Sequence, residues 1–257
     1  MVKNKIIKLC LTNFWSILFS LFLISIIHPQ APDERGYIVK IGDPCPDFKL
    51  EFSDGSFTTV KELQDKVIMF QFTASWCSVC RNEMPHIEKE VWGVYKDLGL
   101  VVIGIDRDEP VQTVRQFAKE TQISYPLALD PGANIFGLFA HKESGVTRNI
   151  IINPKGEIVF LTRLFDPEEF KKMIQVIHSE LENLVTQEKI HMEQEKLSLE
   201  GQLTELDNSI QGSDNDKGLQ NTIHKQRKNV SEKIRDIKKE EEKLRQREEK
   251  LREIKSS

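Results

Sequence analysis

The sequence lacks several features that would place it in a common functional class. Its 257 residues carry 36 Lys plus Arg against 40 Asp plus Glu, so no excess of positive charge favours binding to nucleic acid. Four cysteines are too few for a disulfide-stabilised scaffold. Residues 185–257 contain no Phe, Tyr, Trp, Pro or Cys. We therefore expect one globular domain between an apolar start and a charged tail.

The first 28 residues have the outline of an export signal. Three lysines precede 19 uncharged residues at 9–27, and no small-residue cleavage pattern follows. The run exceeds the ~7–15 residues of a cleavable signal core and approaches the ~20 of a membrane-spanning helix. A buried core helix is the alternative. Since the lysines come first, we expect residues 1–28 to anchor the chain on the periplasmic side of a bacterial inner membrane, or to secrete it, with 29–40 as a linker.

The middle of the chain alternates strand-like and helix-like segments. Apolar runs of strand length occur at 67–72 and 100–105, and apolar residues recur every three or four positions over 78–98. This alternation predicts an α/β fold, a mixed sheet covered on both faces. The other expected elements are a hairpin over 48–59, helices over 111–121, 133–139 and from Asp166, and strands over 127–129, 149–152 and 158–164.

Two cysteines, Cys77 and Cys80, stand between a predicted strand and the first turn of a predicted helix. Unpaired N–H groups and the positive helix dipole stabilise a thiolate there, and a second thiol one turn later can attack a mixed disulfide. We interpret Cys77 as the nucleophile and Cys80 as the resolving thiol of a redox-active pair. Zinc sites share this spacing but need two more ligands, and no second paired motif exists. Trp76, directly before Cys77, also favours redox chemistry, so no metal or organic cofactor is expected.

The string FTASWCSVCRNEMP at 72–85 lies between GDPCPDFKL and INPKGEIV. With these flanks, residues 41–181 resemble the thiol–disulfide oxidoreductases of the thioredoxin superfamily, in the TlpA/ResA branch. The resemblance implies a thioredoxin-like fold, which we assign to residues 41–184, and dithiol–disulfide exchange with protein substrates. Glu83 and Pro85 match the Glu-X-Pro of this family. Glu83 is either a proton shuttle or a solvated carboxylate, and Pro85 is expected to kink its helix.

The family places a cis-proline opposite the cysteines, and this sequence departs from that pattern. Counting back from the turn at 153–156 puts Thr147 at the proline position. A cis bond before a non-proline residue costs about 3–4 kcal/mol, so either the fold bears that strain or the loop is trans and has another shape. The next residue, Arg148, either supplies positive charge to the Cys77 thiolate or lies on the surface.

The tail, residues 185–257, is rich in Glu, Lys, Gln and Arg on both sides of a polar loop at 211–218. Apolar residues recur at seven-residue steps, which indicates a helical coiled coil in the form of an antiparallel hairpin. These residues are Val185, Met192, Leu199 and Leu206 before the loop, and Ile223, Val230, Ile237, Leu244 and Leu251 after it. We expect the hairpin to pack on itself or to form a homodimer. A solvated, frayed arm is the alternative.

Two functions from different classes follow. The first is an extracytoplasmic thiol–disulfide oxidoreductase that acts on protein thiols and disulfides and receives electrons from a membrane or periplasmic donor. The alternative is a membrane-tethered scaffold that assembles partners through its helical hairpin. Peroxide reduction is disfavoured, because the Pro-X-X-X-Thr-X-X-Cys arrangement of peroxiredoxins is missing.

Overall fold

The computed structural model describes residues 33–211 and 217–256. The predicted anchor, residues 1–28, lies outside the described residues, as does the start of the predicted linker. Among the residues that are described, none of the helices combines the length and the apolar character that a membrane crossing requires.

A seven-stranded mixed sheet forms the centre of the described part of the chain, in the order β2-β1-β5-β4-β3-β6-β7. Strands β3, β4 and β5 are parallel, and β6, β7, β1 and β2 extend the sheet with antiparallel pairs on its two sides. The strands are β1 (Lys49–Phe52), β2 (Phe57–Thr59), β3 (Val67–Thr73), β4 (Leu100–Arg107), β5 (Leu127–Asp130), β6 (Arg148–Ile152) and β7 (Ile158–Leu161).

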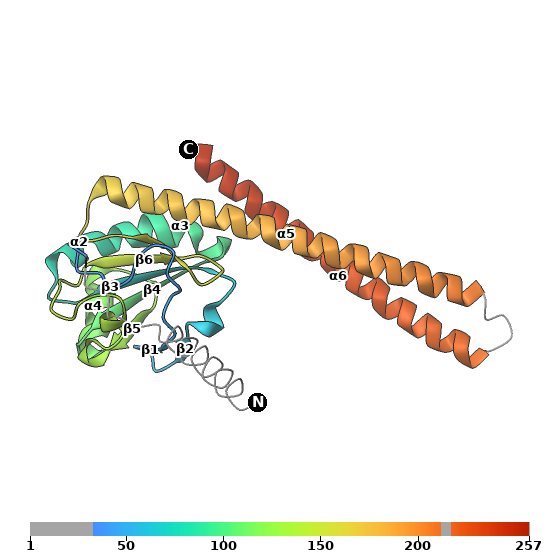
Figure 1. Cartoon of the computed structure of the whole chain (residues 1–257), viewed down its shortest axis with the longest axis horizontal. Helices are drawn as coiled ribbons and strands as arrows, with labels where there is room; N and C mark the ends of the chain where they lie inside the picture. The colour runs from blue at the N-terminus through green and yellow to red at the C-terminus, as the bar shows by residue number, and fades with distance from the viewer. Residues whose placement is uncertain (1–32, 212–216, 257) are drawn as a thin grey trace, which may run out of the picture.

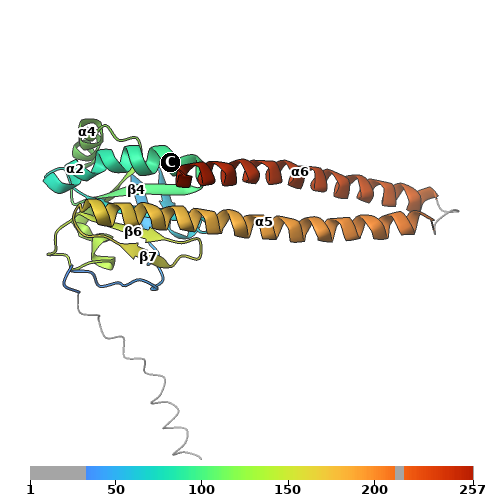
Figure 2. The ribbon, with the colours of Figure 1, turned by 90° about the horizontal axis from the view of Figure 1, so that it is seen from above.

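Helices cover one face of this sheet, and loops with short turns cover the other. Alternate residues of β3 and β4 point to opposite faces, so the sequence VIMFQFT of β3 is buried at every position. The helical face packs against α2 (Ser78–His86), α4 (Val111–Thr121) and α5 (Pro167–Gln211) (Figures 1 and 2). The second core lies under the aromatic side chains Tyr37, Phe48, Phe136 and Phe139.

The predicted helix over 78–98 is not one regular helix. After α2 the chain forms a π-helical segment, Ile87–Trp92, then α3 (Gly93–Tyr95) and a 3-10 turn. The change of geometry follows Pro85, which has no N–H to donate to a carbonyl of the preceding turn. Likewise, the expected helix over 133–139 is a pair of short 3-10 turns, and β7 ends at Leu161 rather than at residue 164.

The last helix of the domain continues into the tail without a break. α5 has 45 residues, about 67 Å at 1.5 Å per residue, so it extends well past the sheet (Figure 1). The predicted boundary between residues 184 and 185 lies inside this helix. α6 (Lys217–Ser256) returns alongside α5 in the opposite direction, with ion pairs such as Lys189 with Glu248 at 2.7 Å and Lys255 with Glu182 at 3.0 Å. Coiled-coil packing and dimerisation stay predictions.

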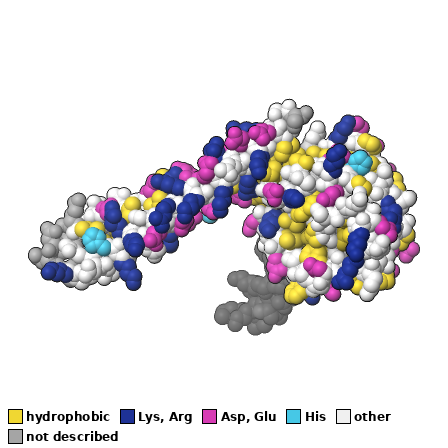
Figure 3. Space-filling view, turned by 180° about the vertical axis from the view of Figure 1, so that it is seen from behind, with side chains coloured by type: hydrophobic (Ala, Val, Ile, Leu, Met, Phe, Trp, Pro, Cys, Tyr) yellow, Lys and Arg dark blue, Asp and Glu magenta, His cyan; other side chains and the backbone are white. Residues whose placement is uncertain are grey.

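The end of α6 packs on the domain as well as lying alongside α5. Leu244 and Leu251 belong to the same apolar core as the helical face of the sheet. Arg247 Nη2 donates a hydrogen bond to the Leu98 carbonyl at 3.0 Å. Beyond this contact, the hairpin carries interspersed positive and negative side chains along its length (Figure 3). The last residues of the seven-residue pattern, Leu244 and Leu251, therefore pack against the domain and are also part of the hairpin.

Candidate active site

The two cysteines lie where β3 passes into α2. Four residues after β3 ends, Cys77 caps the N-terminus of α2, and Cys80 lies in its first turn. Their Cα atoms are 5.3 Å apart, and the two residues form a disulfide. The Cys77 Sγ also accepts a hydrogen bond from the Cys80 N–H at 3.2 Å. An N–H aimed at this sulfur, together with the helix dipole, stabilises negative charge on it when the disulfide opens.

The two sulfurs differ in access to solvent. Cys77 is half-buried, whereas Cys80 is fully buried. Trp76, beside Cys77, exposes 64% of its surface, although large aromatic side chains are usually mostly buried. An attacking or attacked sulfur has to be reached by its partner, so this arrangement favours Cys77 as the first sulfur to react. The roles assigned to the two cysteines stay predictions.

Thr147 is brought directly against the disulfide. Its Oγ1 lies 3.1 Å from the Cys77 Sγ and 3.2 Å from the Cys80 Sγ. None of the peptide bonds in the described residues is cis, so the loop takes the trans alternative. The position expected of a proline ring is thus occupied by a hydroxyl, which can donate a hydrogen bond to either sulfur and stabilise a thiolate there.

Arg148 makes its contacts away from the cysteines, and the surface alternative for this residue was wrong. It is fully buried, so it is not a surface residue. Its guanidinium lies 4.4 Å from the centre of the Tyr37 ring and donates hydrogen bonds to the Arg35 carbonyl and the Ser144 hydroxyl. The physical reason is the alternation of an extended chain, which sends neighbouring side chains to opposite faces. Since Thr147 points to the sulfurs, Arg148 points away from them.

Glu83 is buried, so the solvated alternative for this residue was wrong. It lies three residues after Cys80 and therefore on the same side of α2. Its carboxylate accepts hydrogen bonds from Asn149 Nδ2 at 2.7 Å and from Gln71 Nε2 at 3.3 Å. Burial raises the pKa of Glu83 to about 7, against the lowering effect of these two donors. A carboxyl group with such a pKa can give and take a proton at neutral pH. Pro85, by contrast, is exposed on α2.

Three residues of this polar cluster were missed in the sequence. Gln71 interrupts the apolar run of β3, and Asn149 precedes three isoleucines in β6. The Tyr125 hydroxyl completes the cluster by donating to Gln71 Oε1 at 2.6 Å. A polar side chain inside an otherwise apolar strand was the available signal, because a buried amide needs a partner. The identity of that partner depends on which strands are neighbours.

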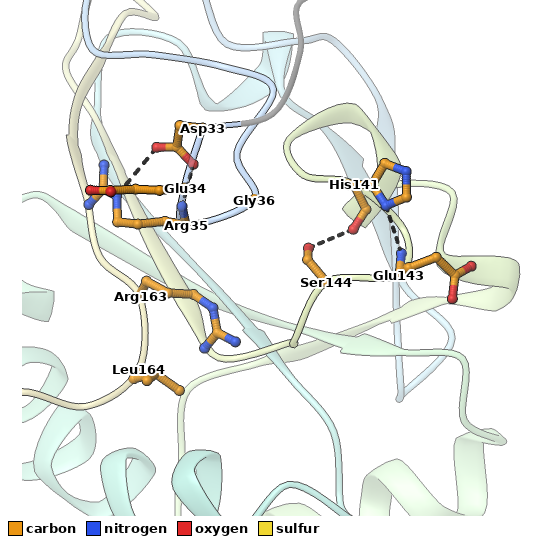
Figure 4. A pocket seen from close by; sticks show the side chains of 9 residues that line it. All are labelled: Asp33, Glu34, Arg35, Gly36, His141, Glu143, Ser144, Arg163 and Leu164. Carbon is orange, nitrogen blue, oxygen red and sulfur yellow. Dashed lines mark hydrogen bonds and ion pairs between the residues drawn. The ribbon is translucent and has the colours of Figure 1, made fainter.

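A cavity of about 590 Å³ opens on the surface of the domain (Figure 4). Arg163 lines it and donates a hydrogen bond to the Thr147 carbonyl at 3.4 Å, so this side chain connects the cavity wall to the backbone of Thr147. The other lining residues come from three segments of the chain. They are Asp33, Glu34, Arg35, Gly36, His141, Glu143, Ser144 and Leu164.

The fold and the cysteine pair define a thiol–disulfide oxidoreductase of thioredoxin-like architecture, and comparison with known proteins agrees. The AhpC/TSA family model matches residues 41–161. The thiol–disulfide oxidoreductase ResA of Halalkalibacterium halodurans is 33% identical over 122 residues, which cover 48% of this chain and 68% of that protein. ResA of Oceanobacillus iheyensis is 29% identical and covers 55% of this chain and 73% of its own length.

Solved structures show the same relationship. The solution structure of a candidate protein disulfide isomerase from Bacteroides thetaiotaomicron is 52% identical, with a TM-score of 0.56, and covers 57% of this chain and 92% of its own. A candidate thiol:disulfide interchange protein DsbE from Chlorobium tepidum, 24% identical with a TM-score of 0.50, covers 56% and 99% and shares the fold. The chain belongs to the family of thiol–disulfide oxidoreductases that includes ResA.

Replacing Glu83 with Gln should slow disulfide exchange near pH 7 by roughly 100-fold, the lower end of what general acid–base catalysis contributes. The reason is that Gln cannot exchange a proton, whereas the Glu83 pKa of about 7 lets the carboxyl do so. Rates of reduction of a small disulfide, measured against pH, test this. Glu90→Gln, which changes an exposed carboxylate further along the same helical run, is the control. Equal rates for the two variants would contradict the role.

The same substitution has a second expected effect, on stability. The native pKa of about 7 lies above the ordinary value of 4.5, so between these pH values the native state holds a proton that the unfolded chain has lost. The free energy of unfolding therefore falls as pH rises through this window. In Glu83→Gln this contribution should vanish, which chemical denaturation at several pH values can measure.

Proposed function

We propose that this protein exchanges disulfides with protein substrates outside the cytoplasm, and that it does so with the Cys77–Cys80 dithiol alone, without a metal or organic cofactor. The observation that carries the proposal is the unequal access to the two sulfurs of one disulfide. Cys77, half-buried at the start of α2, can form a mixed disulfide, and the buried Cys80 lies close enough to resolve it.

The surroundings of Cys77 favour a protein as substrate. The exposed Trp76 offers an apolar contact next to the reacting sulfur, and aromatic anchors of this kind are common in protein interfaces. The cavity that Arg163 lines offers charged groups of both signs a short distance along the surface. Both features suit an extended segment of a protein better than a small disulfide.

The location rests on the sequence. Three lysines followed by 19 uncharged residues support a membrane anchor with the rest of the chain on the periplasmic side. An electron donor in the membrane or periplasm would then reduce the Cys77–Cys80 disulfide after each turnover. We propose the same location for the substrates.

Expression of the full chain in a bacterium with two membranes tests the location and the substrate class together. We expect the protein in the inner-membrane fraction, cleaved by protease added from the periplasmic side. After reduction and extraction, it should reduce the disulfides of insulin. A soluble periplasmic product that begins near Ala31 would show that residues 1–28 are a cleaved signal and not a membrane anchor. A protein that reduces small disulfides but leaves insulin intact would contradict the proposed substrate class.

A scaffold that assembles partners through the α5–α6 hairpin is a second candidate. The hairpin extends past the domain (Figure 1). It exposes Ile190, Leu197 and Leu219 among its charged residues. A scaffold would keep its partners when Cys77 is replaced by Ser, whereas the oxidoreductase would lose its function. Pairing of two hairpins in a homodimer belongs to this candidate, and the molar mass in solution decides it.

A further inference from the structure

A second buried acid lies under the start of α2, apart from the cluster around Glu83. Asp106 on β4 pairs in register with Thr73 on β3, four residues before Cys77. It is fully buried, and neither of its carboxylate oxygens has a hydrogen-bond partner among the described residues. A buried carboxylate without a donor is costly, so its charge state needs an explanation.

Glu109 stands between Asp106 and the loop that carries the cysteines. Its Oε2 accepts a hydrogen bond from the Ser75 N–H at 2.5 Å, and its Oε1 accepts one from the Ser75 hydroxyl at 2.6 Å. One carboxylate therefore holds both the backbone and the side chain of a residue two positions before Cys77. Because bonds to an ionised acceptor are strong, this contact positions the loop.

Asp106 and Glu109 can form a hydrogen bond only if one of them carries a proton, since two carboxylates have no donor. Burial, and then the nearby Glu109 carboxylate, raises the pKa of Asp106 to about 8. A protonated Asp106 has a donor that it can offer to the Glu109 carboxylate, whose oxygens accept the two hydrogen bonds from Ser75. Such a bond would give the buried Asp106 the partner that it lacks.

The other charged groups around Asp106 act in the same direction or are engaged elsewhere. Asp130 on β5 adds a second negative neighbour, held in place by the N–H groups of Ile135 and Phe136 at 2.8 Å. Arg81 on α2 bonds to the Ser75 carbonyl and to Glu120. The described residues include no group of three or more Asp, Glu, His or Cys side chains arranged to hold a metal ion.

We propose that Asp106 is a positioning residue for disulfide exchange, which acts through Glu109 on the segment Ser75–Cys77. With its proton in place, Asp106 orients Glu109, and Glu109 holds the segment so that Cys77 faces the substrate. When Asp106 ionises, two neighbouring carboxylates repel each other at a site with little water, and the two bonds to Ser75 weaken. The proposal concerns the exchange reaction itself and does not depend on the location or the identity of the substrate.

Fluorescence of Trp76 in the oxidised full chain tests the proposal, because the disulfide form has no reactive thiol to titrate. The signal is the difference between the protein and its Trp76→Phe variant, between about pH 6 and pH 9.5, where most tyrosine and lysine side chains keep their charge state. We expect a transition near pH 8 that is lost in Asp106→Asn, since an amide donates to Glu109 at every pH. Glu83→Gln should keep the transition, which separates Asp106 from the other buried acid.

Rates provide the second readout. Asp106→Ala removes the donor and should lower the exchange rate about tenfold near pH 7, within the range that a small displacement of a reacting group costs. Asp106→Asn should recover most of that rate. A Trp76 transition that survives in Asp106→Asn, or equal rate losses in the Ala and Asn variants, would overturn the proposal. If the Ala variant does not fold, the fluorescence comparison of the protein with Asp106→Asn still decides the question.

Discussion

Replacement of Cys77 by serine is expected to lower the rate of disulfide exchange by at least about a thousandfold, to the background level, because the sulfur that forms the mixed disulfide is removed. Cys80→Ser should behave differently. Cys77 can still attack in that variant, but the buried thiol that resolves the mixed disulfide is missing, so the protein should accumulate covalent complexes with its substrates. Non-reducing electrophoresis and mass spectrometry of the two variants distinguish these outcomes.

Cys45→Ser is the matched control for this pair. Cys45 is a free cysteine, partly buried, and burial raises its pKa to about 12, so it carries almost no thiolate at neutral pH. We expect this variant to exchange disulfides at the rate of the unmodified protein. Mixed disulfides that form on Cys80 in the Cys77→Ser variant would reverse the assignment of the two roles. Covalent complexes that disappear with Cys45 would move the reaction to another site.

Truncation of Leu251 to alanine is expected to lower the free energy of unfolding by about 2–5 kcal/mol, the range for a leucine removed from a packed core. Leu251 is only six residues from the end of the chain, yet it exposes 1% of its surface, because α6 brings it back to the core beneath α5 and the segment around Tyr95. Urea denaturation measures the effect. Loss of this contact should also loosen the whole of α6, since the domain provides its main apolar partner near that end.

Leu197→Ala is the control for this experiment. Leu197 lies on α5, exposes 58% of its surface, and should cost less than about 0.5 kcal/mol when truncated. A tail that is a solvated arm would make the two variants equally stable. Equal values would therefore contradict the docked arrangement of α6. If the free energy of unfolding falls strongly in Leu251→Ala but not in Leu197→Ala, the charged tail is part of the folded domain.

Helices and strands could be predicted where the local sequence carries a strong pattern. Val67–Thr73 is apolar over strand length, and Asp166 followed by Pro167 marks the start of α5, where the Asp166 carboxylate accepts the Glu169 N–H at 2.8 Å. The segment 133–139 was misassigned as one helix because its apolar residues have helical spacing. In the structure this segment packs against the sheet and forms only short 3-10 turns, and Gly132, just before it, has a φ of 70°. The burial of Glu83 could not be predicted from the local sequence either, since an acidic residue on a helix is usually exposed to solvent.

The redox chemistry is local and was therefore visible in the residues themselves. A Cys-X-X-Cys motif after an apolar strand and before a helix already contains the two thiols of a redox-active pair and the helix dipole that stabilises a thiolate at the helix start. Contacts between distant parts of the chain determined which other residues surround the cysteines. The pairing of β6 with β3 set Thr147 against the sulfurs and turned Arg148 away, and the pairing of β4 with β3 placed Asp106 beneath the loop. Contacts between strands and between α6 and the domain depend on the register and direction of segments far apart in sequence, which no local periodicity encodes.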